Sequence, residues 1–143
     1  MARIALKEAK VEALELLEKN WPDIVNEFKL HLKDKHHFRG AVHVDQEGAR
    51  RRVKEAVFVA LEDEERDELT GELMYQGYTD GEVIWVHKDI DYESMVGTLV
   101  HEALHDSVFI LRTTRTLTKR GLSCADEHAV MTRLNGYPGL EAV

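Results

Sequence analysis

Apolar residues recur at helical spacing over residues 3–19, and again from residue 21 to about residue 33. In the first stretch, leucines and alanines alternate with Lys and Glu every three or four positions, which predicts an amphipathic helix. The segment Asn20-Trp21-Pro22-Asp23 interrupts this pattern, because proline is tolerated only in the first turn of a helix. We therefore expect two N-terminal helices with a break near residue 20.

The middle of the chain has the pattern of strands. Residues 73–78 and 82–88 are rich in strand-forming side chains, and Thr79-Asp80-Gly81 between them has the composition of a hairpin turn. Residues 53–61 fit either a strand or the end of a helix that starts near Gln46, since periodicity does not separate the two. A small β-sheet built around a hairpin is the expectation for this region.

Two further helices are expected in the last third of the chain. Asp91 can cap a helix over residues 92–111, and a loop rich in Thr and Arg follows as far as residue 122. Ser123 and Asp126 have the spacing of a capping box, which predicts a last helix that ends near Asn135. Together these elements predict one α+β domain over residues 1–143.

Composition and charge argue against some classes of protein but do not identify a single one. The 143 residues carry a formal net charge of −8, which disfavours general binding to nucleic acid. The basic run Arg50-Arg51-Arg52 is interpreted as a solvated face. The single cysteine, Cys124, permits neither an internal disulfide nor a thiolate zinc cluster. No signal peptide or membrane span is recognisable, so we expect a cytoplasmic protein.

Within the expected helix over residues 92–111 lies the sequence His101-Glu102-Ala103-Leu104-His105, an HExxH pattern. Residues four apart project to the same side of a helix, so both imidazoles can bind one Zn²⁺ ion. Glu102 could then take a proton from water activated by the metal. Thr98 and Asp106 fall in the same sector as the motif residues, while apolar residues cover most of the helix and it has no Lys or Arg. Such a buried polar cluster favours a metal site.

The last helix offers a third metal ligand. Glu127 falls in the centre of an apolar stripe, where a carboxylate needs a partner, and it is our first choice. His128 is the second choice, and Asp126, which already has the capping role, is the third. Three other histidines, His31, His36 and His37, lie among Lys and Asp and are interpreted instead as an exposed, cation-rich helix end.

These residues resemble the zincin metallopeptidases. The order of strand, HExxH helix and later glutamate-bearing helix is most similar to the gluzincin branch, and residues 97–105 are also similar to SprT-like and small phage or viral HExxH domains. The resemblance covers about the last 70 residues. It implies a zincin-like fold, Zn²⁺ as cofactor, and His101, His105 and Glu127 as ligands. Two features depart from these families: Met131 stands where gluzincins carry an aspartate, and residues 107–126 lack a third histidine.

The function expected from these residues is hydrolysis of peptide bonds in a protein or peptide substrate, with Glu102 as general base. A hairpin strand leading into the motif helix would place an extended edge beside the metal, where a peptide can pair as an added strand. His128, Tyr137, Tyr92 and His87 are candidates for stabilising the oxyanion. The alternatives are a metal-stabilised interaction module without activity, in which protein groups fill every metal position, and an acidic helical module that binds no metal.

Overall fold

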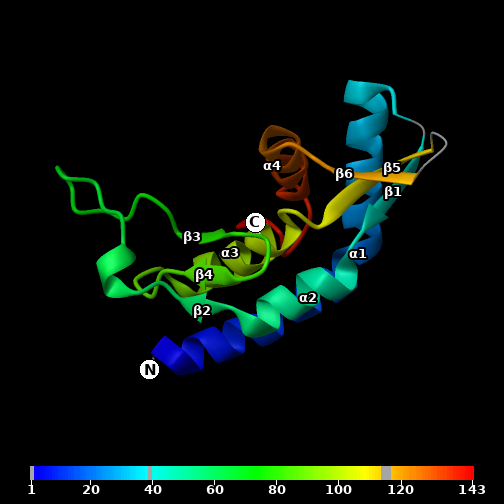
Figure 1. Ribbon diagram of the computed structural model, residues 1–143. Coiled ribbons are helices and arrows are strands. Elements are labelled where there is room, and N and C mark those ends of the chain that lie inside the picture. The colour runs from blue at the N-terminus through cyan, green and yellow to red at the C-terminus, as the bar shows by residue number, and fades with distance from the viewer. Residues whose placement is uncertain (1, 39, 114–116) are drawn as a thin grey trace.

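The computed structural model describes residues 2–38, 40–113 and 117–143, and these residues form a mixed helix-and-sheet structure (Figure 1). In chain order, the elements are α1 (Ala2–His36), β1 (Ala41–Val44), α2 (Gln46–Glu55), β2 (Val57–Phe58), the short 3-10 helix η1 (Leu61–Asp63), β3 (Gly77–Thr79), β4 (Ile84–Val86), α3 (Tyr92–Leu104), β5 (Val108–Thr113), β6 (Leu117–Gly121) and α4 (Cys124–Leu134). This confirms the expected α+β composition.

The N-terminal region is one helix rather than two. α1 continues through Pro22, and Figure 1 shows that its two halves run in different directions. Proline lacks a backbone N–H and its ring crowds the preceding turn, so a proline inside a helix kinks it. The side chain of Asn20 donates to the backbone oxygen of Leu16 at 3.0 Å, which supplies a hydrogen bond within the disturbed turn. The expected break is therefore a bend.

The predicted hairpin is present, with shorter strands than expected. β3 and β4 are antiparallel, and Asp80 accepts hydrogen bonds from the backbone nitrogens of Glu82 and Val83 in the turn between them. The uncertain run 53–61 divides between the end of α2 and the strand β2, which pairs in parallel with β4. The strand order is β2-β4-β3, so β3 lies at an edge of this sheet.

The HExxH helix is shorter than predicted. α3 ends at Leu104, and the residues expected to continue it form β5, which pairs with β1 on one side and β6 on the other. Asp106 has a positive φ of 60°, which turns the chain out of the helix. Apolar runs fit a helix or a strand equally well, so pairing with β1 decides the outcome here. The expected loop before residue 122 contains β6 instead.

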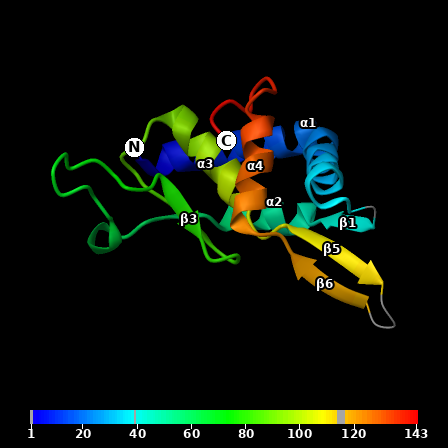
Figure 2. The same ribbon diagram turned by 90° about the horizontal axis from the view of Figure 1, so that it is seen from above.

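α3 lies at the centre of the molecule. It packs against α1, α2, β3 and β4, and nine of its 13 residues are buried. Figure 2 shows α3 enclosed between α1, α4 and the β3–β4 hairpin. A Cβ atom on Gly97 would lie 2.2 Å from the backbone oxygen of Ala142, so this helix position must be glycine for the last residues to pack on it. In the described parts of the chain, no helix is long and apolar enough to cross a membrane.

Candidate metal centre

His101 and His105 lie at the C-terminal end of α3 with their rings side by side. Their Nε2 atoms are 3.1 Å apart, and the ring planes meet at 72°. His101 belongs to the last turn of the helix, and His105 is the first residue after it. The four-residue spacing of the HExxH pattern therefore places both nitrogens at one point, as the helix geometry predicts.

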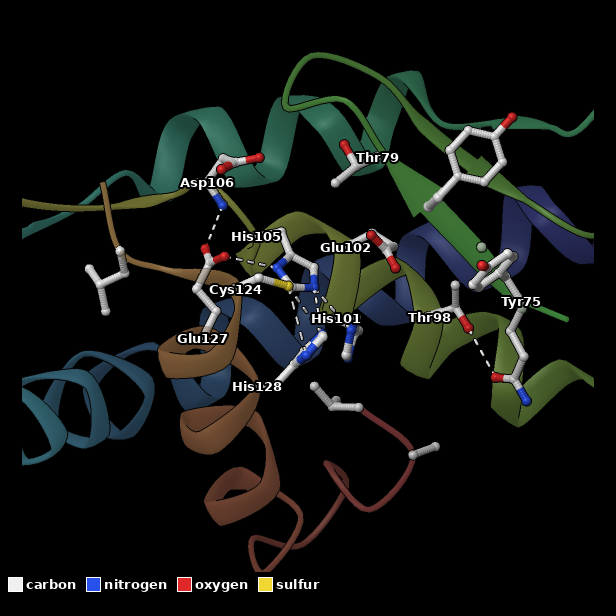
Figure 3. A pocket seen from close by; sticks show the side chains of 16 residues that line it. Tyr75, Thr79, Thr98, His101, Glu102, His105, Asp106, Cys124, Glu127 and His128 are labelled. Atoms are coloured by element: carbon white, nitrogen blue, oxygen red, sulfur yellow. Dashed lines mark hydrogen bonds and ion pairs between the residues drawn. The ribbon is translucent and has the colours of Figure 1, made fainter. Parts of the chain in front are cut away.

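A third imidazole reaches the same point from α4. The Nε2 atom of His128 is 3.1 Å from the Nε2 atom of His105, and the ligand atoms of the three histidines lie within 4.8 Å of one another (Figure 3). Nitrogens bound to one tetrahedral Zn²⁺ at about 2.0–2.1 Å would be separated by roughly 3.3 Å. The spacing of His101, His105 and His128 thus fits a single zinc ion.

Glu127 lies behind His105, outside this group of three nitrogens. Its Oε1 atom accepts from the Nδ1 atom of His105 at 3.0 Å, and its Oε2 atom accepts from the backbone nitrogen of Asp106 at 2.7 Å. A proton on Nδ1 leaves the Nε2 lone pair of His105 free to bind a metal. The buried carboxylate that the sequence analysis singled out therefore has two hydrogen-bond donors as partners.

Asp126 faces a different part of the molecule. Its Oδ1 atom contacts the Nε2 atoms of His31 at 2.8 Å and of His36 at 3.0 Å, and its Oδ2 atom accepts from Ser123 at 2.8 Å. Ser123 also caps α4 as predicted. Burial alone would raise the pKa of Asp126, but the hydrogen bonds from His31, His36 and Ser123 outweigh it and hold this pKa well below its usual range.

Glu102 lines the same cavity as the three imidazoles and is 9% exposed. Burial raises the pKa of its carboxyl group; the nearby His105 opposes this rise, and the negative charges of Glu127 and Asp106 add to it. A carboxylate whose basicity is increased in this way is better suited to accept a proton.

The environment also keeps the imidazole of His101 neutral. Burial is the main cause, with the nearby His105 and His128 as further causes, and together they lower the pKa of His101 to about 4. For His105, burial acts in the same direction, but the hydrogen bond and negative charge of Glu127 outweigh it and raise the pKa. Neutral imidazole is the form that binds a metal, so the lowered pKa of His101 favours binding, whereas a metal that binds His105 must compete with a proton.

A cavity of about 680 Å³ surrounds these groups. β3 lines one side of it, the end of α3 forms its floor, and residues of α4 and the C-terminal segment complete it. The expectation of an extended edge beside the motif is met by β3, the first strand of the hairpin, whereas the second strand, β4, lies in the middle of its sheet. Of the four oxyanion candidates, His128 lines this cavity. Tyr137 instead donates its hydroxyl hydrogen to Glu27.

Arg52 contributes to the site and was not predicted to do so. We interpreted it as part of a solvated basic run, but it is 4% exposed, and its Nη2 atom donates to the backbone oxygen of Ala103 at 2.7 Å. A weaker contact of 3.5 Å joins the same atom to the backbone oxygen of His105. The signal was present in α2, because Ala49, Arg52 and Val53 share one helix face and all three are buried. Arg52 thus supports the helix end that carries both motif histidines.

His31 is buried, although its neighbours predicted an exposed position. His36 and His37 are exposed as expected, whereas His31 is buried against α4. It lies three residues after Phe28 and seven after Ile24, both fully buried, so the apolar stripe of α1 could have indicated its burial.

Comparison of the chain with protein-family models, with curated proteins and with solved structures finds no match.

Proposed function

We propose that the chain is a zincin-type, zinc-dependent metallopeptidase in which His101, His105 and His128 bind the ion and Glu102 is the general base. The observation that carries this proposal is the convergence of three imidazole nitrogens beside a buried carboxylate in a cavity. A catalytic zinc site has three protein ligands and keeps a position for water, and this donor set fits that description. Zinc, when bound, supplies a Lewis acid that activates water near neutral pH.

This proposal replaces Glu127 with His128 as third ligand. The distances favour the change, because the Nε2 atoms of His128 and His105 are 3.1 Å apart while both oxygens of Glu127 already accept hydrogen bonds. Glu127 becomes the positioning residue that fixes the proton on Nδ1 of His105 and orients its ring. Carboxylates in this role are common partners of histidine ligands.

Glu102 has the properties that the reaction requires of a base. Its carboxylate accepts a proton from water and then passes that proton to the amine that leaves when the peptide bond breaks. Its burial supports this role, since desolvation raises the pKa of the carboxyl group. Most residues of α3 around it are buried, which limits the contact of this carboxylate with bulk water.

β3 supports a peptide as the substrate. It is an edge strand that lines the cavity, so one side of its backbone is not paired within the β2-β4-β3 sheet. An extended peptide can add to such an edge through main-chain hydrogen bonds, with its side chains directed alternately to the two faces. Pairing in this way would bring a peptide bond past Glu102 and the imidazoles.

Glu102→Gln is the direct test. The change keeps the size of the side chain and removes the base, so we expect zinc to stay bound while hydrolysis falls by about 10²–10⁴-fold. Zinc content is measured by atomic absorption, and cleavage of denatured casein by mass spectrometry. Glu93→Gln, an exposed position in the first turn of the same helix, is the matched control and should leave both values unchanged. Hydrolysis that persists in the Glu102→Gln variant would refute the proposed mechanism.

A second candidate is a closed, structural zinc site in a protein-interaction module. The favouring observation is Cys124, whose Sγ atom is 3.9 Å from the Nε2 atom of His128 and which can also group with His105 and Glu127. A thiolate in the fourth position would leave no place for water. Cobalt substitution separates the two candidates, because a thiolate ligand gives a sulfur-to-metal charge-transfer band that Cys124→Ser would abolish.

Cys124 does not have the environment of a nucleophile. Burial and the negative charges of Glu127, Glu102 and Asp106 raise the pKa of its thiol in the metal-free protein, which disfavours the reactive thiolate. This argues against a cysteine hydrolase.

A further inference from the structure

We propose that His31, His36 and Asp126 form a second divalent-cation site of the Zn²⁺ type, which joins the C-terminal end of α1 to the start of α4. The three residues offer two imidazole nitrogens and one carboxylate oxygen, and these ligand atoms lie within 4.8 Å of one another. Two nitrogens and one oxygen are a donor set that zinc accepts. No residue of this group belongs to the proposed catalytic site.

The geometry of the group fits coordination. The Nε2 atoms of His31 and His36 are 2.8 and 3.0 Å from the same oxygen, Oδ1 of Asp126. These distances approach the roughly 3.3 Å expected between ligands of one tetrahedral zinc ion. Both histidines come from the last two turns of α1, so one helix directs two ligands at α4.

The second oxygen of Asp126 is already fixed. Ser123 donates to Oδ2 at 2.8 Å, which sets the orientation of the carboxylate and leaves Oδ1 directed at the two imidazoles. Hydrogen bonding of this kind to a coordinating carboxylate is typical of metal sites.

Exposure differs across the group in a way that gives an ion access. The side chains of His31 and Asp126 are 8% and 12% exposed, whereas that of His36 is 45% exposed. A cation can therefore approach from the side of His36, and water can fill the remaining position. Because His31 and Asp126 are buried, their side chains are held in place before an ion binds.

Lys35 is the competitor for this position. Its Nζ atom is 3.6 Å from Oδ1 of Asp126, and its side chain is 55% exposed, so its ammonium group can move into solvent when an ion binds. In the absence of a cation, Lys35 places a positive charge near the carboxylate, and the two histidines contact it through their ring nitrogens. Removing the lysine charge should favour the cation.

The test is a zinc titration of the full chain against a chromophoric chelator, comparing wild type with His36→Ala. We expect the His36→Ala variant to bind one equivalent of zinc fewer than wild type. His37→Ala, the exposed neighbouring histidine, is the matched control and should bind as wild type does. Lys35→Met should bind the same equivalent more tightly. Because His36 is largely exposed, its removal should not unfold the protein, and circular dichroism checks this.

The outcome is independent of the catalytic proposal. If the proposed catalytic site bound no zinc, wild type would take up one equivalent rather than two, and the His36→Ala variant would still lose it. The His101→Ala/His105→Ala double variant should keep the equivalent that depends on His36. Equal stoichiometry in wild type, His36→Ala and His37→Ala would overturn the second site, as would unchanged zinc affinity in both His36→Ala and Lys35→Met.

Discussion

At the scale of single residues, the hydrogen bond between Glu127 and His105 determines which nitrogen of His105 can face the other two imidazoles without a proton. Glu127 holds a proton on Nδ1 of His105, and the opposite nitrogen of that ring lies 3.1 Å from both His101 and His128. With its proton on Nδ1, the ring of His105 has a single lone pair on Nε2, which cannot make good hydrogen bonds to both His101 and His128. A cation shared by the three nitrogens would remove this conflict.

His128→Ala and Glu127→Gln distinguish a ligand from a positioning residue. We expect the loss of the His128 imidazole to weaken zinc binding by more than about 100-fold, and Glu127→Gln to weaken it by about 10–100-fold, the usual effect of losing a partner of a ligand. Zinc affinity measured by competition with a chelator gives both numbers. A larger effect for Glu127→Gln than for His128→Ala would restore Glu127 as the third ligand.

The site shows what residue patterns can predict. The pairing of His101 with His105 follows from helix geometry, which is local and therefore readable from spacing. The burial of Glu127 was also predictable, because it lies within the apolar stripe of α4. Its partners were not, since they depend on how α4 is rotated about its axis relative to α3. That rotation depends on how α4 packs against α1. The sequence of α4 by itself does not reveal this packing.

At the scale of elements, the early end of α3 shapes the site. The helix stops at Leu104, and the chain leaves it through the left-handed residue Asp106. The last carbonyl groups of a helix lack internal partners, and Arg52 from α2 donates to one of them, that of Ala103. The positive charge of the Arg52 side chain also complements the negative C-terminal end of the helix dipole. α2 thus stabilises the turn that directs His105 toward the cavity.

Arg52→Met should therefore destabilise the fold. The change leaves the buried carbonyl oxygen of Ala103 without its donor, so we expect a loss of about 1–3 kcal/mol in the free energy of unfolding. Urea denaturation followed by circular dichroism measures it in the zinc-free protein. Arg51→Met, at the exposed neighbouring position, should change the stability by less than about 0.5 kcal/mol. Equal stabilities for the two variants would show that Arg52 does not support α3.

Elements were predicted best where their signals were local. The caps Asp91 and Ser123 and the turn at Asp80 were identified from short-range chemistry, and each is present. β5 was missed because it pairs with β1, which is distant in sequence, as in the pair Val44 and Val108. β6 pairs with β5 and was missed with it. Local propensity cannot reveal a partner of this kind.

At the scale of the whole molecule, the candidate catalytic site joins parts of the chain that are distant in sequence and are connected through the hydrogen bonds of Glu127 to His105 and Asp106. The last turn of α3 and its C-cap contribute two imidazoles and α4 contributes one, and the two helices are separated in sequence by the β5–β6 hairpin (Figure 2). A ligand that binds only the folded state adds to its stability, because the unfolded chain does not preserve the site.

Zinc should therefore raise the melting temperature. At free zinc about 100-fold above the dissociation constant, binding adds about 2.7 kcal/mol, which corresponds to a rise of roughly 10 °C for a chain of this size. Differential scanning calorimetry with zinc and with EDTA measures the shift. Glu102→Gln should show the full rise, whereas His101→Ala should show a smaller one. A melting temperature independent of zinc in the wild type would contradict the metal centre.

Three consecutive residues of α4 face three different surroundings: Asp126 contacts α1, Glu127 contacts His105, and His128 reaches the group of imidazoles. Successive side chains of a helix are turned by about 100° from one another. Adding or deleting a single residue ahead of this triplet within α4 would turn all three away from their partners at once. Natural variants of this protein should consequently keep a fixed number of residues between Ser123, the cap of α4, and this triplet.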